Sequence, residues 1–163
     1  MLGLGLMLSG CGFHLRGVEH FPPALRAMFI ETKYPNTPMV LRLREQLMDN
    51  GVVLVPSKNQ SLTVLELSDL STDDQAISLL GAGQASIHRL TDSVTYTLRD
   101  ASTQKVLAGP QTIRVSRNYS TNASLILSDS YEADQISLAL QRELASGVFA
   151  GLSRVEIHET AAS

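Results

Sequence analysis

The stretch from residue 89 to residue 120 alternates apolar and polar side chains, the two-residue period of a β-strand with one buried face. A polar segment from Asp100 to Lys105 interrupts this pattern and is suited to a turn. We therefore expect two long antiparallel strands that form a hairpin. The residues expected on its buried face are Leu90, Val94, Tyr96, Leu98, Ile113, Val115 and Tyr119.

The opposite face of this predicted hairpin carries hydroxyl groups and arginines. A turn centred between residues 102 and 103 places Thr91 opposite Arg114. Arg89 and Arg114 are then diagonal neighbours, close enough to contact one ligand. Pro110 has no backbone N–H, so we expect the pairing to be interrupted there, at an edge or at a bulge.

Two amphipathic helices are predicted, one before and one after the strands. Thr37-Pro38 suits the start of the first helix and Asn50-Gly51 its end. Asp129 and Glu132 resemble a capping box for the second, which should end near Ser153. The apolar stripes are Val40, Leu43 and Leu47, with Leu41 and Met48 beside them, and then Ile136, Leu140, Leu144, Val148 and Leu152.

Two further strands are expected, over residues 27–33 and 62–70. Asp73-Asp74 is interpreted as a solvated turn, and Gly81-Ala82-Gly83 as a bulge or break before the hairpin. The expected fold class is α+β, with two amphipathic helices packed on one face of a roughly four-stranded mixed sheet with a long hairpin. The expected limits are a single domain over 27–157 and a flexible tail over 158–163.

No catalytic or metal site is predicted. The histidines, at positions 14, 20, 88 and 158, are scattered without the spacing of a zinc helix. No serine lies in a nucleophile-elbow context. The absence of Trp and the low aromatic content argue against a base-stacking nucleic-acid module. We predict a protein that is not an enzyme, has no cofactor and does not bind nucleic acid.

The N-terminal segment resembles the processing signal of bacterial lipoproteins. Leu8-Ser9-Gly10-Cys11 has the small residues and the cysteine of a lipobox. We expect residues 1–10 to be removed, Cys11 to become the lipidated N-terminus, and residues 11–26 to form a tether. Since Cys11 is the only cysteine, no thiol then remains for a disulfide or a metal site.

Charge is unevenly distributed along the chain, whose net charge is −3. The segment 89–117 contains more basic than acidic residues, whereas the segments before and after it are acidic. This pattern favours a local surface that faces an anion. The basic residues of the segment are Arg89, Arg99, Lys105, Arg114 and Arg117.

The residues that begin at the lipidated cysteine carry a family resemblance. Cys11-Gly12-Phe13-His14-Leu15-Arg16-Gly17 closely resembles the start of mature LptE (RlpB), the lipopolysaccharide-assembly lipoproteins of Gram-negative bacteria. The predicted order of strand, helix, long hairpin and C-terminal helix agrees with that family. The resemblance implies an outer-membrane lipoprotein that is anchored on the periplasmic side by acyl chains on Cys11.

The same resemblance implies the partners. The domain is expected within the lumen of the LptD β-barrel, as plug and assembly partner in lipopolysaccharide transport to the cell surface, with direct lipopolysaccharide binding. The candidate contacts to lipopolysaccharide phosphates are Arg89, Arg114, Arg117 and Arg99, because Arg recognises phosphate through paired, charge-assisted hydrogen bonds. The candidate contacts to the barrel are Phe13, Leu15 and Arg16.

Three alternatives stay open at this point. The arginines are equally interpreted as solvated charges or as contacts to the barrel wall. A free-standing periplasmic lipoprotein that binds a lipid or an anion would have a deep apolar pocket and would function as a monomer. A periplasmic hydrolase would need histidine, aspartate and serine side chains that converge in the fold.

Overall fold

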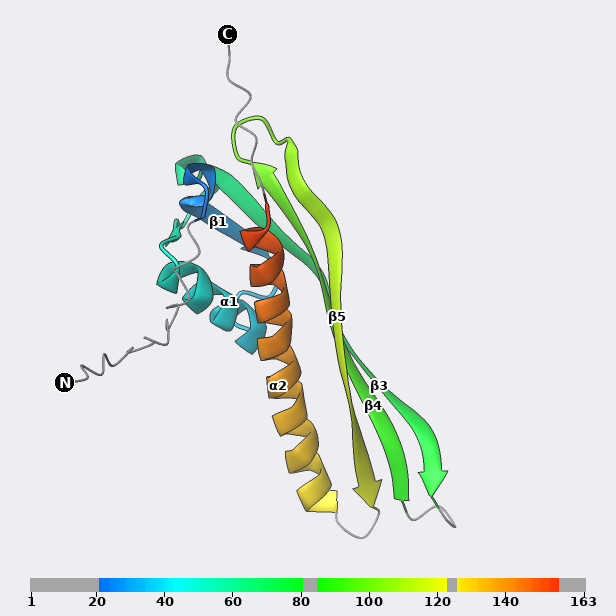
Figure 1. The fold of residues 1–163 in the computed structure, drawn as a ribbon. Coiled ribbons are helices and arrows are strands. Elements are labelled where there is room, and N and C mark those ends of the chain that lie inside the picture. Colours follow the sequence, from blue (N-terminus) through cyan, green and yellow to red (C-terminus); the bar gives the residue numbers. More distant parts are fainter. Residues whose placement is uncertain (1–20, 81–84, 123–125, 156–163) are drawn as a thin grey trace, which may run out of the picture.

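The computed structural model describes residues 21–80, 85–122 and 126–155. One helix lies along most of a long sheet, and a second helix and a short strand lie near one end of it (Figure 1). The elements in chain order are η1 (Pro23–Leu25), β1 (Ala27–Thr32), α1 (Pro38–Asp49), β2 (Val53–Leu54), η2 (Lys58–Gln60), β3 (Thr63–Leu80), β4 (Ala85–Asp100), β5 (Val106–Asn122) and α2 (Ile126–Ser153).

The predicted α+β class is confirmed, with five strands in place of roughly four. The sheet order is β2-β1-β3-β4-β5. β1 runs parallel to β2 and β3, whereas β3, β4 and β5 form an antiparallel meander. The additional strand, β2, has only two residues, too few for the alternation that identifies a strand in a sequence.

The hairpin of β4 and β5 is confirmed, but the predicted register is wrong for most of its length. Thr91 pairs with Ser116 and Ser93 with Arg114, whereas near the turn Arg99 pairs with Val106. The shift of two residues arises at the irregular pairing beside Gly109-Pro110, where the interruption was expected. Since the side-chain period of a strand is two, this shift leaves the predicted faces unchanged.

β3 is much longer than the expected strand 62–70. It pairs with β4 as far as Leu80, with irregularities after Ser68 and after Ala76. The interpretation of Asp73-Asp74 as a solvated turn is therefore wrong. Pairing with a regular, well-patterned β4 extends β3 through a polar segment that has little strand propensity of its own.

The two predicted helices form, with differences at their surfaces and limits. Thr37 caps α1, where its Oγ1 accepts a hydrogen bond from the Val40 N–H at 3.5 Å, and Gly51 follows the helix with a φ of 83°. Leu41 and Met48 are exposed, so they lie outside the buried stripe. α2 starts at Ile126, before the expected capping box at Asp129, because the residues between them join the helix.

Both helices pack on the same face of the sheet, which we call the inner face. The main core lies between α1, α2 and the strands, and it includes Phe21 and Leu25, which precede the expected start of the domain. A smaller cluster farther along the sheet consists of Leu90, Tyr119 and Leu140. Within the described ranges, no helix is long and apolar enough to cross a membrane.

Candidate ligand-binding surface

The face of the sheet opposite the helices, which we call the outer face, is polar along β3, β4 and β5. Hydroxyl groups pair across it, as between Ser71 and Ser93 and between Thr95 and Thr112, each at 2.9 Å between oxygens. These polar pairs follow from the period of two, because the apolar residues of each strand are used on the inner face. The result is a hydrophilic surface that neither of the described helices, α1 and α2, covers.

Arg89 and Arg114 both lie on this outer face. The Arg89 Nε–H donates to the Asn118 Oδ1 at 3.3 Å, and Arg114 is exposed opposite Ser93. The corrected register separates the two arginines by four residues along the strands, roughly 13 Å, so they are not diagonal neighbours. They can contact two groups of one extended ligand but not a single small anion.

The other two predicted arginines lie apart from this pair. Arg99 is at the turn end of β4, where its Nε lies 3.4 Å from the Glu66 Oε2. Arg117 points to the inner face, where it forms an ion pair with Glu143 of α2 at 3.1 Å. The structure therefore does not bring the four predicted arginines into one cluster.

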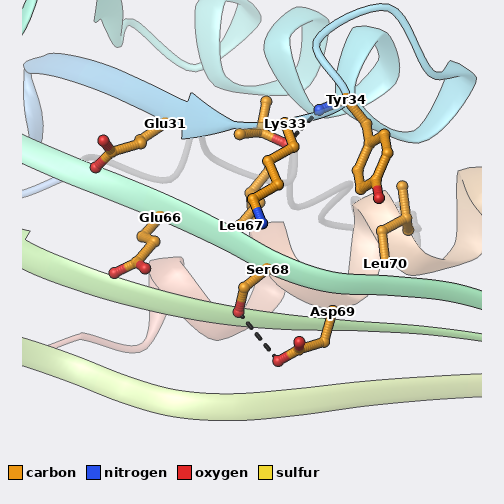
Figure 2. A pocket seen from close by; sticks show the side chains of 9 residues that line it. Glu31, Lys33, Tyr34, Glu66, Leu67, Ser68, Asp69 and Leu70 are labelled. Carbon is orange, nitrogen blue, oxygen red and sulfur yellow. Dashed lines mark hydrogen bonds between the residues drawn. The ribbon is translucent and has the colours of Figure 1, made fainter.

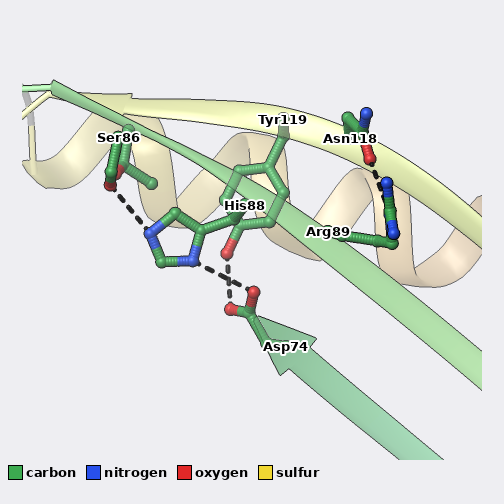
Figure 3. Close-up of polar contacts among 7 residues, drawn as sticks. Asp74, Ser86, His88, Arg89, Asn118 and Tyr119 are labelled. Atoms are coloured by element: carbon green, nitrogen blue, oxygen red, sulfur yellow. Dashed lines mark hydrogen bonds and ion pairs between the residues drawn. The ribbon is translucent and has the colours of Figure 1, made fainter. Parts of the chain in front are cut away.

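A second group of polar side chains lies on the inner face near the far end of the sheet (Figure 3). Asp74 of β3 accepts a hydrogen bond from the Tyr119 hydroxyl at 2.6 Å, and its other oxygen lies 3.1 Å from the His88 Nδ1. The His88 Nε2 lies 2.9 Å from the Ser86 Oγ, which is 2.7 Å from the Thr121 Oγ1. These contacts connect all three long strands.

Burial is the main cause of the pKa shift of Tyr119 in this group. Tyr119 is 8% exposed, and its burial, together with Asp74, raises the pKa of its phenol to about 12. The rings of His88 and Tyr119 also pack, with centroids 5.3 Å apart. Tyr119 thus stays a hydrogen-bond donor to the carboxylate at neutral pH.

The order serine, histidine, aspartate in this group is the order of a nucleophilic triad. However, the Ser86 hydroxyl is shared with Thr121, and its strand is paired on both sides, so its backbone N–H groups belong to the sheet. An oxyanion site needs free N–H donors beside the nucleophile. Sequence reasoning missed this group because Asp74 was assigned to a turn.

A hollow of about 480 Å³ opens where β1 ends beside β3 (Figure 2). Its charged side chains are Glu31, Glu66 and Asp69 against a single Lys33. Outside the hollow, Lys58 pairs with Glu31 at 2.7 Å. The charged groups of the hollow are therefore mostly acidic, unlike those of the deep apolar pocket expected of a carrier of lipids.

The remaining predicted site residues lie outside the described part of the chain. These are the lipidation site Cys11 and the candidate barrel contacts Phe13, Leu15 and Arg16. The Gly81–Gly83 segment is also outside it. Among the described residues, no group of three or more His, Cys, Asp or Glu side chains is arranged to hold a metal ion.

The architecture is that of a class of small α+β domains found in bacterial lipoproteins. The rare lipoprotein B from Shewanella oneidensis has a TM-score of 0.67 at 20% identity, over 78% of this chain and 93% of that one. The uncharacterized lipoprotein B from Nitrosomonas europaea also has a TM-score of 0.67, at 21% identity over 91% of this chain and 99% of that one. At these identities the likeness establishes the fold.

The sequence defines the family. The model of the lipopolysaccharide-assembly family LptE matches residues 25–152, and the chain belongs to this family. It is 29% identical to the LPS-assembly lipoprotein LptE of Photorhabdus laumondii, over 89% of this chain and 79% of that protein. It is 25% identical to LptE of Yersinia pestis, over 98% of this chain and 76% of that protein.

Membership of this family answers the question of catalysis. The family consists of non-enzymatic assembly lipoproteins, in agreement with the prediction that the chain is not an enzyme. The Asp74, His88 and Ser86 contacts are accordingly structural. They fasten β3, β4 and β5 together where the apolar cluster beneath them is small.

Proposed function

We propose that this protein is an outer-membrane lipoprotein that acts as plug and assembly partner of the LptD barrel in lipopolysaccharide transport to the cell surface. The observation that carries the proposal is the family match over residues 25–152, together with relatives named LPS-assembly lipoproteins at 25–29% identity. The domain lies within the barrel lumen, and Phe13, Leu15 and Arg16 contact the barrel or the membrane surface near the anchor.

The proposed anchor is the set of acyl chains on Cys11. Two lipid chains already give stable attachment to a bilayer, so three are sufficient. The anchor holds the domain on the periplasmic side of the outer membrane. Since Phe21 and Leu25 pack in the core, only the part of the expected tether that precedes Phe21 gives the domain the reach to enter the barrel.

The proposed ligand surface is the outer face of the sheet, with direct binding of lipopolysaccharide. Arg89 and Arg114 contact two phosphate groups of one extended ligand, since they share a face but are roughly 13 Å apart. Arg99 extends this surface toward the turn. Arg117 lies on the inner face with Glu143, so of the four arginines it supports the proposal least.

The plug role is tested by co-purification. The full-length chain is expressed in Gram-negative cells and isolated from outer membranes, and we expect a large β-barrel protein to purify with it in a fixed ratio. The control is Cys11→Ala, which should leave the chain unanchored and lower the yield of the complex. A wild-type chain that purifies from outer membranes alone, as a stable monomer, would favour the free-standing lipoprotein instead.

The ligand surface is tested by charge reversal. Arg89→Glu with Arg114→Glu should weaken lipopolysaccharide binding at least tenfold and leave barrel assembly intact, because both residues lie away from the core. The matched control is Arg42→Glu with Arg154→Glu, which has the same charge change at two exposed positions outside the strands and leaves all four candidate arginines in place. Equal loss of binding in both double variants would reject the outer-face site but not the plug role.

A further inference from the structure

Asp92 is a carboxylate inside the fold with unused hydrogen-bonding capacity. It lies on the inner face of β4, is 1% exposed, and accepts a hydrogen bond from the Thr72 hydroxyl to its Oδ1 at 2.7 Å. Its Oδ2 is buried and has no hydrogen-bond partner within the part of the chain that the structure describes. Burial raises the pKa of this carboxyl, and the hydrogen bond from Thr72 only partly opposes that change.

An unpaired carboxylate in this position is costly. A buried charge destabilises a fold unless a cation or several donors satisfy it, and an apolar side chain of similar size often packs at lower cost. The neighbouring positions on the same face of β4 are indeed occupied by buried apolar side chains, Leu90 and Val94. A donor from outside the described chain would complete the hydrogen bonding of the Asp92 Oδ2.

A pocket is available for such a donor. Asp92 lines a space of about 210 Å³ between β3, the start of α1 and the middle of α2, which we call the Asp92 pocket. Its other polar walls are Thr37, Ser71, Thr72 and Gln141. The Gln141 Oε1 already accepts a hydrogen bond from the Met39 N–H at 3.3 Å. The Ser71 hydroxyl pairs with Ser93 on the outer face, so the side-chain oxygens that remain for a cationic donor are those of Thr37, Thr72, Gln141 and Asp92.

The charge around the pocket also favours a cation. Tyr34 and Leu70 line both the Asp92 pocket and the acidic hollow at the end of β1, so the two spaces are adjacent. β3 contains no Lys or Arg from Thr63 to Leu80. Acidic groups in adjoining concave spaces add to a negative potential that attracts positive charge.

The backbone beside the pocket is open to a partner. β1 pairs with β3 only as far as Thr32 and Leu67, so the edge of β3 from Ser68 to Leu80 has no neighbouring strand among the described residues. An extended chain can add to such an edge. We propose that the Asp92 pocket is a docking site for a Lys or Arg side chain of a partner protein whose extended segment lies along this free edge.

The first test uses the full-length chain and no barrel, so it is independent of the proposed plug role. Ethylammonium chloride, which corresponds to the end of a lysine side chain, is titrated up to about 100 mM, a range that covers millimolar affinity. We expect saturable NMR shift changes at Thr72, Asp92 and Gln141. Sodium chloride at the same ionic strength should not produce them.

Two variants with the same charge change distinguish binding in the Asp92 pocket from a general effect of the protein's charge. Asp92→Asn should weaken ethylammonium binding at least tenfold and leave the protein as stable or more stable, because it removes an unpaired buried charge. Asp73→Asn, on the exposed outer face, should bind as the wild type does. Unchanged binding by Asp92→Asn, an equal response to sodium chloride, or no saturable response would overturn the proposal.

The second test asks whether the cation belongs to a partner. A photo-reactive phenylalanine analogue replaces Tyr34, which is half exposed at the pocket mouth, or Tyr131 of α2 as the control position. We expect cross-links from position 34 in cells to a peptide with Lys or Arg next to the linked residue, reduced at least tenfold by Asp92→Asn. Cross-links that persist in this variant, or that reach only this chain's own N-terminal segment, would overturn the proposal.

Discussion

Asp100 shows how one carboxylate fixes the end of the long hairpin. Its Oδ1 accepts hydrogen bonds from the backbone N–H and the hydroxyl of Ser102, and from the same two groups of Thr103, at 2.7–3.0 Å. These bonds lower the pKa of Asp100 to about 2. A carboxylate satisfied by its own turn specifies where the chain reverses, and the polar segment 100–105 was predictable as a turn for that reason.

We predict that Asp100→Asn removes an acid-dependent part of the stability. Since the folded pKa of Asp100 is below the unfolded value, its contribution is present above about pH 4 and is lost as the pH falls toward about 2. Urea unfolding of the wild type and the variant should therefore differ most at neutral pH and converge near pH 2. The control Asp73→Asn should show no such convergence, and parallel pH profiles for wild type and Asp100→Asn would contradict the assignment.

Among the elements, α1 was predictable and β3 was not, for a physical reason. Local residues determine where α1 starts and ends. Thr37-Pro38 caps and begins the helix, and Asn50-Gly51 ends it, as such residues commonly do. The outer half of β3 instead takes its conformation from β4, to which it is paired. Local patterns therefore identified the helix, whereas the long-range pairing that aligns Asp74 with His88 and Tyr119 left no signal.

The irregular pairing of β5 with β4 lies beside Gly109, and replacing this glycine tests how closely the two strands must approach. Gly109 has a φ of 84°, and a Cβ there would lie 2.5 Å from the Tyr96 carbonyl oxygen. Gly51 has nearly the same φ, 83°, with nothing within 4 Å of its Cβ position. Gly51→Ala should cost about 1–2 kcal/mol for the backbone conformation alone. Gly109→Ala should cost about 1–3 kcal/mol more, because its Cβ displaces a neighbouring strand.

Urea denaturation measures both variants under the same conditions. NMR contacts between β4 and β5 should also show the register around Arg114 disturbed in Gly109→Ala and unchanged in Gly51→Ala. Equal losses of stability in the two alanine variants would mean that the close approach to Tyr96 has no energetic role.

Over the whole molecule, the core is uneven along the sheet. The end near the turn of β4 and β5 is covered by both helices, whereas the far end rests on α2 through Leu90, Tyr119 and Leu140. The sequence predicted this layering and the faces of the strands from periodicity alone. It did not predict how far apart Arg89 and Arg114 lie along the strands, because an irregularity near Pro110 changes the register without changing the pattern.

We predict that the far end of the sheet opens first. β4 is paired on both sides at residues 87–91 and, within 94–98, at Thr95, Tyr96 and Leu98, so these positions differ mainly in what packs on them. Amide hydrogen exchange should be at least about tenfold faster at 87–91. Leu140→Ala should speed exchange at 87–91 with a smaller effect at 94–98. Equal protection of the two segments would show that the fold opens only as one unit.

The exposed edge of β5 has a further consequence, for association between copies of the chain. Over its whole length from Val106 to Asn122, β5 has no neighbouring strand on one side within the described structure. Bare edges of this length invite intermolecular pairing and aggregation unless charge or proline discourages it. Pro110, Arg114 and Arg117 lie on this strand and are exposed. The arginines of β5 considered for ligand binding thus also discourage pairing along this edge, so neutral replacements are less suitable probes of binding than charge reversal.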